Sequence, residues 1–429
     1  MLPECRTKGD VFSIPKFSVV TEDIDDFIQE LEVFHEEFSD CFLRSEPRNN
    51  FFHYMVGQFS ELERKSIEPI ALNVENGKVR SMQRLISDVE WAENKMLNKY
   101  LSMVNEDMGD PNGVVIFDES GFVKKGDDSA GVAKQYCGTA GKVENCQVGV
   151  FAAYASPHGY CLVDNKLFIP EKWFTDEYTE RRKKCNFPEN REFKTKPQLA
   201  ADIFEELVKD DVIPFKFVVA DTIYGNSPDF IEAIEACPGK TYFVSIPHST
   251  KCWLKQPITR EKKYKYAGEI RSKQVVGKHE KISLSVETIA KNLNNYFWYR
   301  RTVSEGTKGP IEYEFTKRQV VLSKDGLPWK HVWLIIKRTL GDEPSYYYYI
   351  SNAGGNTPMK TFVWLSGIRW AIEQCLEETK SELGMDHYEV RKLPGWKHHM
   401  ITCMLAHFFL WHLKIRLGEK STIYYFVAA

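Results

Sequence analysis

The sequence has no large excess of charge of either sign. It contains 57 Lys and Arg residues against 60 Asp and Glu residues, so the formal net charge of its 429 residues is −3. A uniformly basic nucleic-acid binder is therefore excluded, and any contact with DNA must come from local patches. Long hydrophobic runs are also missing, because the longest apolar-rich stretch, residues 401–411, is too short to cross a bilayer.

Paired cysteine motifs are missing as well. Ten cysteines are present, but no two of them form a C-x-x-C pair, which argues against a zinc ribbon or a redox motif. Isolated thiols in a chain of this length predict small buried side chains in a reducing compartment. The first residues show no basic segment followed by an apolar stretch, the pattern of a secretory signal. We therefore expect a cytoplasmic protein that does not enter a membrane.

The sequence does contain enough apolar residues to form several hydrophobic cores. Hydrophobic residues make up 43% and aromatic residues 13% of the chain, which excludes disorder as its general state and predicts two or three domains. Residues 1–110 show helical periodicity, including an acidic amphipathic helix at 22–40. This part of the sequence predicts a helical N-terminal domain.

The hydrophobic period changes after residue 110. Strands are predicted at 114–118, 146–156, 160–170, 215–221 and 241–246, and helices at 198–209 and 228–236. Their alternation predicts an α/β core with a mixed sheet over residues 111–250. Residues 251–350 are rich in β-formers, with one short helix near 288–293, and predict a β-rich insertion. Helices at 358–383 and 396–415 then complete the core within residues 351–418.

Two of the predicted strands end in an aspartate, Asp118 after VVIF and Asp221 after FVVA. In open α/β sheets the carboxyl ends of strands face the ligand crevice. Two carboxylates that lie close together there repel each other unless a cation separates them, and oxygen ligands favour Mg²⁺ or Mn²⁺. Taken singly, each acid is better explained as the cap of a following turn or helix.

The helix predicted at 358–383 carries charged residues on one face. Arg369, Glu373, Glu377 and Lys380 occur at i, i+4, i+8 and i+11, within a sector of about 80°. The adjacent stripe is apolar and is expected to pack on the sheet: Leu365, Ile368, Ile372, Leu376 and Leu383. Glu373 lies at the boundary and could reach a site beside the sheet. The competing explanation is a solvated face with ordinary ion pairs.

IRWAIEQCLEETK fits the R-x3-E-x6-K part of a Y-x2-R-x3-E-x6-K signature, and through it the sequence resembles bacterial insertion-sequence transposases of the DDE group. The segments around Asp118 and Asp221 resemble the first and second acidic motifs of this group. Further segments resemble one of its subgroups: 42–48, 63–71, 305–310, 346–355 and 382–399. The resemblance implies an α/β fold with an RNase H-like mixed sheet flanked by helices, an all-β insertion and an N-terminal helical domain.

The resemblance also implies a catalytic triad of Asp118, Asp221 and Glu373 that holds two Mg²⁺ (or Mn²⁺) ions. Asp118 would bridge both ions, while Asp221 holds one and Glu373 the other. The sequence departs from the signature at Ser366, where the family has a tyrosine, so a hydroxyl remains but the aromatic phosphate contact is lost.

Other acids compete for these roles. Glu119 follows Asp118 directly, but strand alternation points it to the opposite side. Glu377 and Glu378 are alternative third acids, and the spacing to Arg369 and Lys380 favours Glu373.

The implied activity is metal-dependent cleavage of DNA at the ends of the element, followed by strand transfer into target DNA. Its implied partners are the terminal inverted repeats, the target DNA and a second copy of the chain in a homodimer. Residues 1–110 would recognise the element's ends. Arg369 and Lys380 would hold phosphates beside the cleaved bond.

A local basic patch could add further DNA contacts. Residues 255–281 hold nine Lys and Arg residues against three acids, interleaved with Tyr264 and Tyr266. We predict Lys262, Lys263 and Lys265 as DNA-binding residues of this patch. A solvated β-hairpin with ordinary charges explains the same pattern equally well.

Two other functions compete with an active transposase. The first is a decayed or domesticated transposase that binds DNA without cutting it, which Ser366 motivates. The second is an aspartyl-phosphate hydrolase with Asp118 as nucleophile, which ranks far lower because Ser120 stands where a second aspartate is usual. The histidines His398, His399, His407 and His412 suggest a metal cluster, but no acid completes the set and structural roles are favoured.

Overall fold

The computed structural model describes residues 21–418 except 268 and 307–308, without side chains at 21–26, 305–306 and 417–418. Residues 419–429, for which the sequence predicts no role, lie outside the described part. The described residues form two compact units, of which unit 1 comprises 217–369 and unit 2 comprises 21–216 and 370–418. The chain therefore passes between the units twice, after residue 216 and after residue 369.

Unit 2 begins with the helices that the sequence predicts before residue 110: α1 (Thr21–Glu36), α2 (Ser45–Gln58), α3 (Ile67–Asn73), α4 (Val79–Ser87) and α5 (Glu93–Met108). The predicted acidic helix corresponds to α1. Its apolar stripe is buried at Leu31 and Phe34, and the ring of Phe34 lies 5.2 Å from that of Phe409 in the last helix of the chain.

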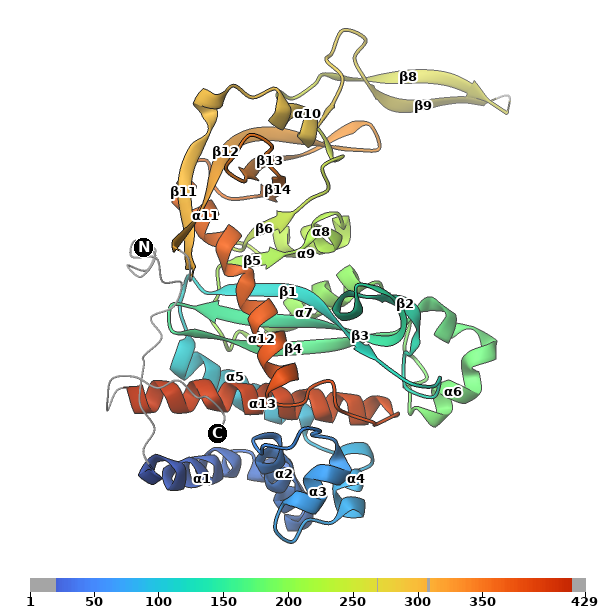
Figure 1. Ribbon diagram of the computed structural model, residues 1–429. Coiled ribbons are helices and arrows are strands. Elements are labelled where there is room, and N and C mark those ends of the chain that lie inside the picture. Colours follow the sequence, from blue (N-terminus) through green and yellow to red (C-terminus); the bar gives the residue numbers. More distant parts are fainter. Residues whose placement is uncertain (1–20, 268, 307–308, 419–429) are drawn as a thin grey trace. The chain divides into compact units, whose positions relative to one another are not determined.

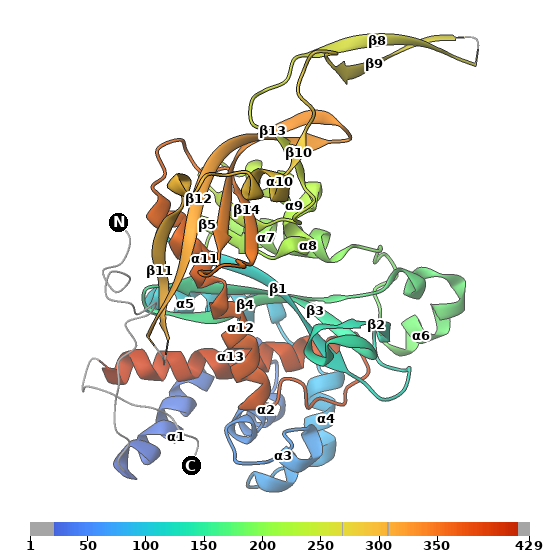
Figure 2. The ribbon, with the colours of Figure 1, turned by 45° about the horizontal axis from the view of Figure 1, so that its top comes forward.

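The sheet of unit 2 is antiparallel and consists of β1 (Val114–Val123), β2 (Ala133–Cys137), β3 (Lys142–Ser156) and β4 (Gly159–Phe168), with β3 pairing with the other three. Its helices are α6 (Thr179–Lys184), α7 (Lys196–Asp210), α12 (Trp370–Ser381) and α13 (Leu393–Gly418). Helix α12 crosses one face of this sheet and α7 lies behind the other (Figure 1, Figure 2). The buried strands β3 and β4 explain the apolar runs from which they were predicted.

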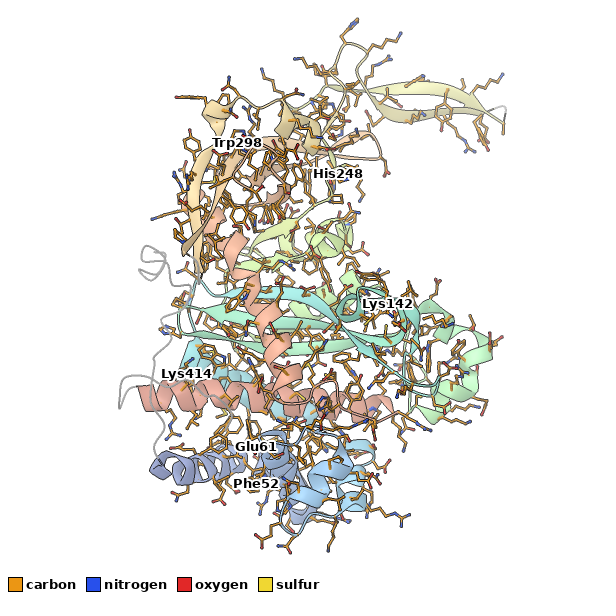
Figure 3. The ribbon with its side chains drawn as sticks, in the orientation of Figure 1. Phe52, Glu61, Lys142, His248, Trp298 and Lys414 are labelled. Atoms are coloured by element: carbon orange, nitrogen blue, oxygen red, sulfur yellow. The ribbon has the colours of Figure 1, made fainter. Side chains whose placement is uncertain are left out.

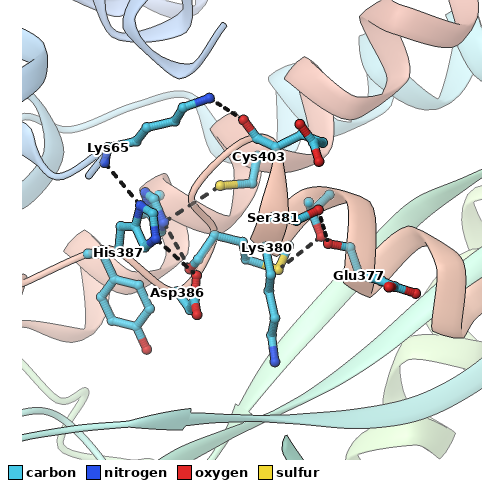
Figure 4. Close-up of polar contacts among 12 residues, drawn as sticks. Lys65, Glu377, Lys380, Ser381, Asp386, His387 and Cys403 are labelled. Carbon is cyan, nitrogen blue, oxygen red and sulfur yellow. Dashed lines mark hydrogen bonds and ion pairs between the residues drawn. The ribbon is translucent and has the colours of Figure 1, made fainter. Parts of the chain in front are cut away.

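Helix α13 joins the N-terminal helices to the sheet of unit 2. The ring of His398 stacks on Trp91 at 4.2 Å between centroids, and the hydroxyl of Tyr54 lies 2.8 Å from Nδ1 of His399. Around the loop before α13, the backbone amide of Lys65 donates to Nδ1 of His387 at 3.0 Å (Figure 4). The N-terminal helices thus share a buried core with α13.

Unit 1 contains further β-strands. Its strands are β5 (Phe217–Ala220), β6 (Thr241–Ser245), β7 (Lys251–Trp253), β10 (Leu284–Ser285), β11 (Tyr299–Gly306), β12 (Gly309–Lys324), β13 (Leu327–Arg338) and β14 (Tyr346–Ser351). They run in the order β10-β7-β12-β13-β14-β6-β5, with β11 also paired to β12. Only β5 and β6 are parallel in the pairings of this unit that the structure describes. The helices are α8 (Thr222–Gly225), α9 (Pro228–Glu235), α10 (Val286–Lys291) and α11 (Met359–Ile368).

A two-stranded ribbon, β8 (Thr259–Tyr266) and β9 (Glu269–Val276), forms a separate sheet within unit 1. It extends from the β-rich part of this unit as a long hairpin (Figure 1). In the same β-rich part, Trp298 is 7% exposed (Figure 3), and the Arg338 guanidinium lies 4.1 Å from its ring centre. Trp298 is therefore part of the buried core of unit 1.

The remaining short elements are 3-10 turns: η2 (Ser39–Cys41), η3 (Gly138–Ala140), η4 (Glu171–Phe174), η5 (Asp176–Tyr178) and η6 (Asn295–Phe297). The α/β class predicted from the sequence is confirmed, because unit 2 combines the antiparallel strands β1–β4 with helices such as α7, and unit 1 combines its strands, the parallel pair β5–β6 among them, with further helices. Within residues 21–418, apart from 268 and 307–308, no helix is long and apolar enough to cross a membrane.

The single helix predicted at 358–383 is wrong, since α11 ends at Ile368 and α12 begins at Trp370. Arg369 keeps helical dihedral angles, but its amide donates to Gly367 rather than continuing the i−4 ladder. Gly367 provides the physical reason, because a β-carbon there would lie 2.8 Å from Cγ1 of Val303 on β11. The close approach of the strand requires glycine, and glycine is a common site of helix kinks.

Candidate active site

Asp118 lies inside β1 rather than at its end. The sequence predicts that the strand stops at this acid, whereas β1 continues to Val123 and Asp118 pairs with Phe151 of β3. The residues after Asp118 read as a turn, but β3 extends far enough to pair with them. Asp118 is half-buried, and its Oδ1 accepts a hydrogen bond from the Glu119 amide at 2.8 Å.

The face on which Asp118 lies follows from the register of the sheet. Val114, four residues before it, is opposite Ala155, which is opposite Tyr160 of β4. The hydroxyl of Tyr160 donates to Glu378 of α12 at 3.0 Å. Because directly paired residues share a face and strand side chains alternate, Asp118 lies on the face that α12 covers.

Glu119 lies on the other face, as strand alternation predicts. Its carboxylate accepts a hydrogen bond from Lys196 at 2.7 Å, and Lys196 begins α7. A capping box fixes that end of α7, since Thr195 accepts from the Gln198 amide and Gln198 reciprocates. The two adjacent acids are thus held on opposite sides of one strand.

Glu373 lies in the first turn of α12, on the same side of the unit 2 sheet as Asp118. The apolar stripe predicted beside it is buried at all five positions: Leu365, Ile368, Ile372, Leu376 and Leu383. Glu373 itself is exposed. Of the alternative acids, Glu378 is hydrogen-bonded by His407 at 2.8 Å and by Gln374 at 2.8 Å, so its carboxylate is already engaged.

Lys380, near the end of α12, points toward the sheet of unit 2 (Figure 4). Its ammonium donates to the Gly121 carbonyl at 3.2 Å and to Thr139 at 2.9 Å, and it lies 5.0 Å from the ring centre of Phe122. Burial lowers the pKa of Lys380. These contacts tie α12 to the β1 strand that carries Asp118.

Asp221 belongs to unit 1. It follows β5 directly, as predicted, and its Oδ1 accepts a hydrogen bond from the Thr222 amide at 2.6 Å as the cap of α8. Val244 of β6 pairs with Ala220, and Tyr349 of β14 pairs with Ser245. Asp221 is therefore one residue beyond the last β5–β6 pair. It lies at the level of Ser245 and Tyr349, the next row of residues across the sheet.

Arg369 ends the unit 1 segment and lies within electrostatic range of that row. Burial raises the pKa of the Tyr349 hydroxyl, the positive charge of Arg369 lowers it and the negative charge of Asp221 raises it. Arg369 and Asp221 thus both act on one tyrosine. Ser366, at the position of the signature tyrosine, donates its hydroxyl to the Val363 carbonyl at 2.7 Å within its own helix.

Sequence reasoning missed Lys337 of β13. Its side chain is 9% exposed and its ammonium lies 4.6 Å from the ring centre of Tyr313 and 4.7 Å from that of Tyr347. Burial first, and then the positive charge of Arg369, lower the pKa of Lys337 to about 8. The available signal was a lysine near the end of the apolar strand HVWLIIKR, followed along the chain by the four consecutive tyrosines of YYYYIS.

The predicted basic patch forms the β8–β9 ribbon, and every residue of β8 is exposed. Lys262 pairs with Lys273, and Lys263 and Lys265 alternate onto the opposite face from Lys262. Lys273 lies 5.4 Å from the ring centre of Tyr264, and Arg271 lies 4.9 Å from that of Tyr266. The ribbon thus presents positive charge on both faces.

The histidines have structural roles, as predicted. His398 contacts the Ile86 carbonyl at 2.8 Å and Glu93 at 3.1 Å, and His412 contacts Asp107 at 2.6 Å. His399 contacts the Met385 carbonyl at 3.1 Å. Each ring is therefore held by a protein partner.

The donor chemistry of the three predicted acids fits a hard divalent cation, since all three are carboxylates on half-buried or exposed positions. The amide hydrogen bonds of Asp118 and Asp221 fix the orientation of these carboxylates. In the part of the chain that the structure describes, no three His, Cys, Asp or Glu side chains are already gathered around a metal position. Asp118 and Glu373 lie in unit 2 and Asp221 in unit 1, so the triad stays a prediction.

Comparisons with known proteins were made for the whole chain. The sequence pattern of the family described as DDE superfamily endonuclease matches residues 37–310. A probable transposase for insertion sequence element IS701 from Microchaete diplosiphon is 23% identical over 347 residues, which cover 80% of this chain and 77% of the relative. A solved piggyBac transposase synaptic complex with hairpin DNA superposes with a TM-score of 0.42 at 10% identity, covering 93% of this chain and 75% of that one.

Proposed function

Because the chain belongs to the DDE superfamily endonucleases, we propose that it is a transposase that cuts DNA at the ends of its element and joins them to target DNA. The observation that carries this proposal is the common face of the unit 2 sheet on which Asp118 and the α12 helix of Glu373 lie. The similarity to a relative named as an IS701 transposase supports the same activity.

In this proposal Asp118, Asp221 and Glu373 hold two Mg²⁺ or Mn²⁺ ions, with Asp118 shared between them. Ions held there would activate water and stabilise the leaving 3′-oxygen during hydrolysis of the phosphodiester. The oxygen of the attacking water stays on the phosphate, and the leaving 3′-oxygen takes a proton. The resulting 3′-hydroxyl of the element end would then lose its proton and attack a phosphodiester of the target, where it displaces the 3′-oxygen of the target strand, which takes up a proton.

The spacing of residues supports a common position for Asp118 and Glu373. Lys380 contacts Phe122, which follows Asp118 by four strand residues, or about 13 Å. Glu373 precedes Lys380 by seven helical residues, or about 10 Å. The two carboxylates are therefore at similar distances from a shared contact point on the same face.

Arg369 and Lys380 are proposed to hold phosphates beside the cleaved bond. Arg369 is half-buried near Asp221 and Tyr349, where its fixed charge suits a phosphate. Lys380 already hydrogen-bonds Gly121 and Thr139. These two hydrogen bonds also fix α12 on the unit 2 sheet.

The β8–β9 ribbon is proposed to bind DNA through Lys262, Lys263 and Lys265. A two-stranded ribbon fits the major groove of B-DNA, and this ribbon exposes charged side chains on both faces. The lysines that alternate to opposite faces could then contact both phosphate backbones that border the groove. Tyr264 and Tyr266 supply rings for stacking on exposed bases.

The remaining assignments rest on the family. Residues 1–110 are proposed as the domain that recognises the terminal inverted repeats, and two chains are proposed to act as a homodimer on two element ends. Helix α1 is rich in acids and packs on α13 through Phe34. We infer that it supports the domain rather than contacting phosphates.

The test compares single variants of the three carboxylates on DNA that carries the inverted repeats flanking the gene. Asp118→Asn, Asp221→Asn and Glu373→Gln are each expected to abolish Mg²⁺-dependent cleavage while DNA binding stays within about threefold of wild type. EDTA should stop cleavage by the wild type, and added Mg²⁺ or Mn²⁺ should restore it. Unimpaired cleavage by all three variants would remove the proposed site.

A second function is favoured by one observation. The hydroxyl of Ser366, which replaces the signature tyrosine, is bonded to the Val363 carbonyl and does not stand in for a phosphate contact there. A protein that has lost catalysis would bind the terminal repeats but nick them with neither Mg²⁺ nor Mn²⁺. The same cleavage assay on the wild type therefore separates the two functions.

A further inference from the structure

Lys337 lies in an unusual environment in unit 1. Three tyrosine rings surround its ammonium, with centres at 4.6 Å for Tyr313, 4.7 Å for Tyr347 and 5.7 Å for Tyr349. These rings come from β12 and β14, the strands on either side of β13. We call the rings of Tyr313, Tyr347 and Tyr349 around Lys337 the tyrosine cage.

No hydrogen bond or ion pair of the Lys337 ammonium occurs among the residues that the structure describes, although its side chain is 91% buried, being 9% exposed. A neighbouring lysine on the same face differs in this respect. Lys317 of β12 also lies over aromatic rings, at 4.5 Å from the centre of Trp333, but its ammonium donates to the Thr357 carbonyl at 2.5 Å. Cation–π contact alone replaces only part of the lost hydration of Lys337.

The charges around the tyrosine cage leave room for an anion. Burial and then the positive charge of Arg369 lower the pKa of Lys337, and no carboxylate in the described part of the chain acts to raise it. Besides burial, the charges of the surrounding side chains shift the pKa of Tyr349, namely those of Arg369, Tyr347, Tyr313 and Asp221. A bound anion would be attracted by the Lys337 ammonium and would replace the hydration that this buried group has lost.

The sheet places this cage near Asp221. Lys337 pairs with Tyr347, and Tyr349 pairs with Ser245, which is level with Asp221. Three strand spacings separate β13 from β5, or about 14 Å across the sheet. That distance is too long for Lys337 to touch a phosphodiester held at Asp221, and it suits a phosphate farther along the same strand.

We propose that Lys337 and the hydroxyl of Tyr347 bind a backbone phosphate of the DNA strand that Asp221 engages, farther along that strand from the bond to be cut. Tyr347 is 42% exposed, so the cage is open to solvent on the side of this residue. This site rests on the proposed function, and it deepens it by adding a tyrosine hydroxyl and a cation to the proposed contacts with the DNA backbone. Lys337 acts here as a positioning residue for the strand.

The test measures binding of duplex DNA carrying the flanking inverted repeats, with EDTA present so that no strand is cut. The slope of log K against log salt is negative, and the loss of one phosphate contact makes it shallower by about 0.9. Lys337→Met is expected to show that change. The ratio of wild-type to Lys337→Met affinity for DNA should therefore fall about threefold when the salt concentration rises fourfold. Lys337→Arg should restore the slope, and Tyr347→Phe should weaken binding several-fold with an unchanged slope.

Lys317→Met is the matched control, because it removes a caged lysine on the same face whose ammonium has a protein partner. Its salt slope should equal that of the wild type. Equal slopes for Lys337→Met and wild type, or equal affinity of Tyr347→Phe and wild type, would overturn the site. Should Lys337→Met fail to fold, the Tyr347→Phe result decides alone. Absence of repeat binding by the wild type would instead overturn the proposed function.

Discussion

At the scale of single residues, two adjacent acids on β1 lie on opposite faces of the sheet. Asp118 lies on the face of α12 and Glu119 on the face of α7, where it pairs with Lys196. Alternation along a strand is a strictly local rule, so this difference could be predicted from the sequence. The continuation of β1 beyond Asp118 could not, because it depends on β3 being long enough to pair with residues that read as a turn.

The two neighbours therefore offer a matched pair of variants. Glu119→Gln removes the charge that Lys196 contacts at 2.7 Å and is expected to cost about 1–2 kcal/mol of folding free energy. Its rate of DNA cleavage should stay within about threefold of wild type, whereas Asp118→Asn should be inactive yet fold normally. Chemical denaturation and a cleavage assay on both proteins check this. A Glu119→Gln variant that is as stable as wild type but does not cleave DNA would indicate that Glu119, and not Asp118, holds the metal.

At the scale of elements, the kink between α11 and α12 depends on a contact that no local pattern contains. Helical periodicity continues through Arg369, which explains why the sequence predicts one helix. The break comes from β11, whose Val303 approaches Gly367. Similarly, the tyrosine cage around Lys337 requires the register of three strands, and pairing partners distant in sequence are invisible to periodicity.

Substitution of Gly367 tests the origin of the kink. In Gly367→Ala the new β-carbon would meet Cγ1 of Val303 at 2.8 Å, and we expect destabilisation of about 1–3 kcal/mol. Val303→Ala should remove the clash, so the double variant should be more stable than additivity predicts. Thermal unfolding of the two single variants and the double variant measures this coupling, and strict additivity would show that Val303 does not set the kink.

The β8–β9 ribbon offers a second test at this scale. Replacing Lys262, Lys263 and Lys265 together by Gln should lower the slope of log K against log salt by up to about 2.7 on duplex DNA. Folding should be unaffected, because every residue of β8 is exposed. The control replaces Lys209, Lys142 and Lys183, exposed lysines of unit 2, and should leave the slope unchanged. An equal loss in both triple variants would indicate a nonspecific charge effect.

At the scale of the whole molecule, the sequence predicts element types better than their assembly. The α/β class, the strands that carry apolar runs and the family are confirmed, because each depends on short-range pattern or on motifs kept in order. The gathering of Asp118, Asp221 and Glu373 stays a prediction. These residues belong to two compact units, and nothing in a local pattern fixes how such units come together.

The stability of unit 2 should depend on pH through His399. Burial lowers the pKa of His399 to about 3, while an unfolded histidine titrates near pH 6.5. Between these values the unfolded state binds a proton that the folded state does not, so stability falls with decreasing pH, by about 1.4 kcal/mol per unit. That contribution is complete above about pH 6.5.

Chemical denaturation between about pH 6 and pH 4 measures this slope. His399→Gln loses the contact with Tyr54 and should be less stable at neutral pH, but its stability should fall less steeply as acid is added. An identical slope in both proteins would mean that His399 takes up its proton without unfolding of the helices around it.

The ribbon β8–β9 has a consequence for how this protein could change over evolutionary time. An arm whose side chains bury almost nothing contributes little to the stability of the sheet from which it extends. Its residues can therefore be exchanged, lengthened or deleted without compensating changes in the interior. If the ribbon binds DNA as proposed, preference for DNA sites can change there while the interior of the fold stays as it is.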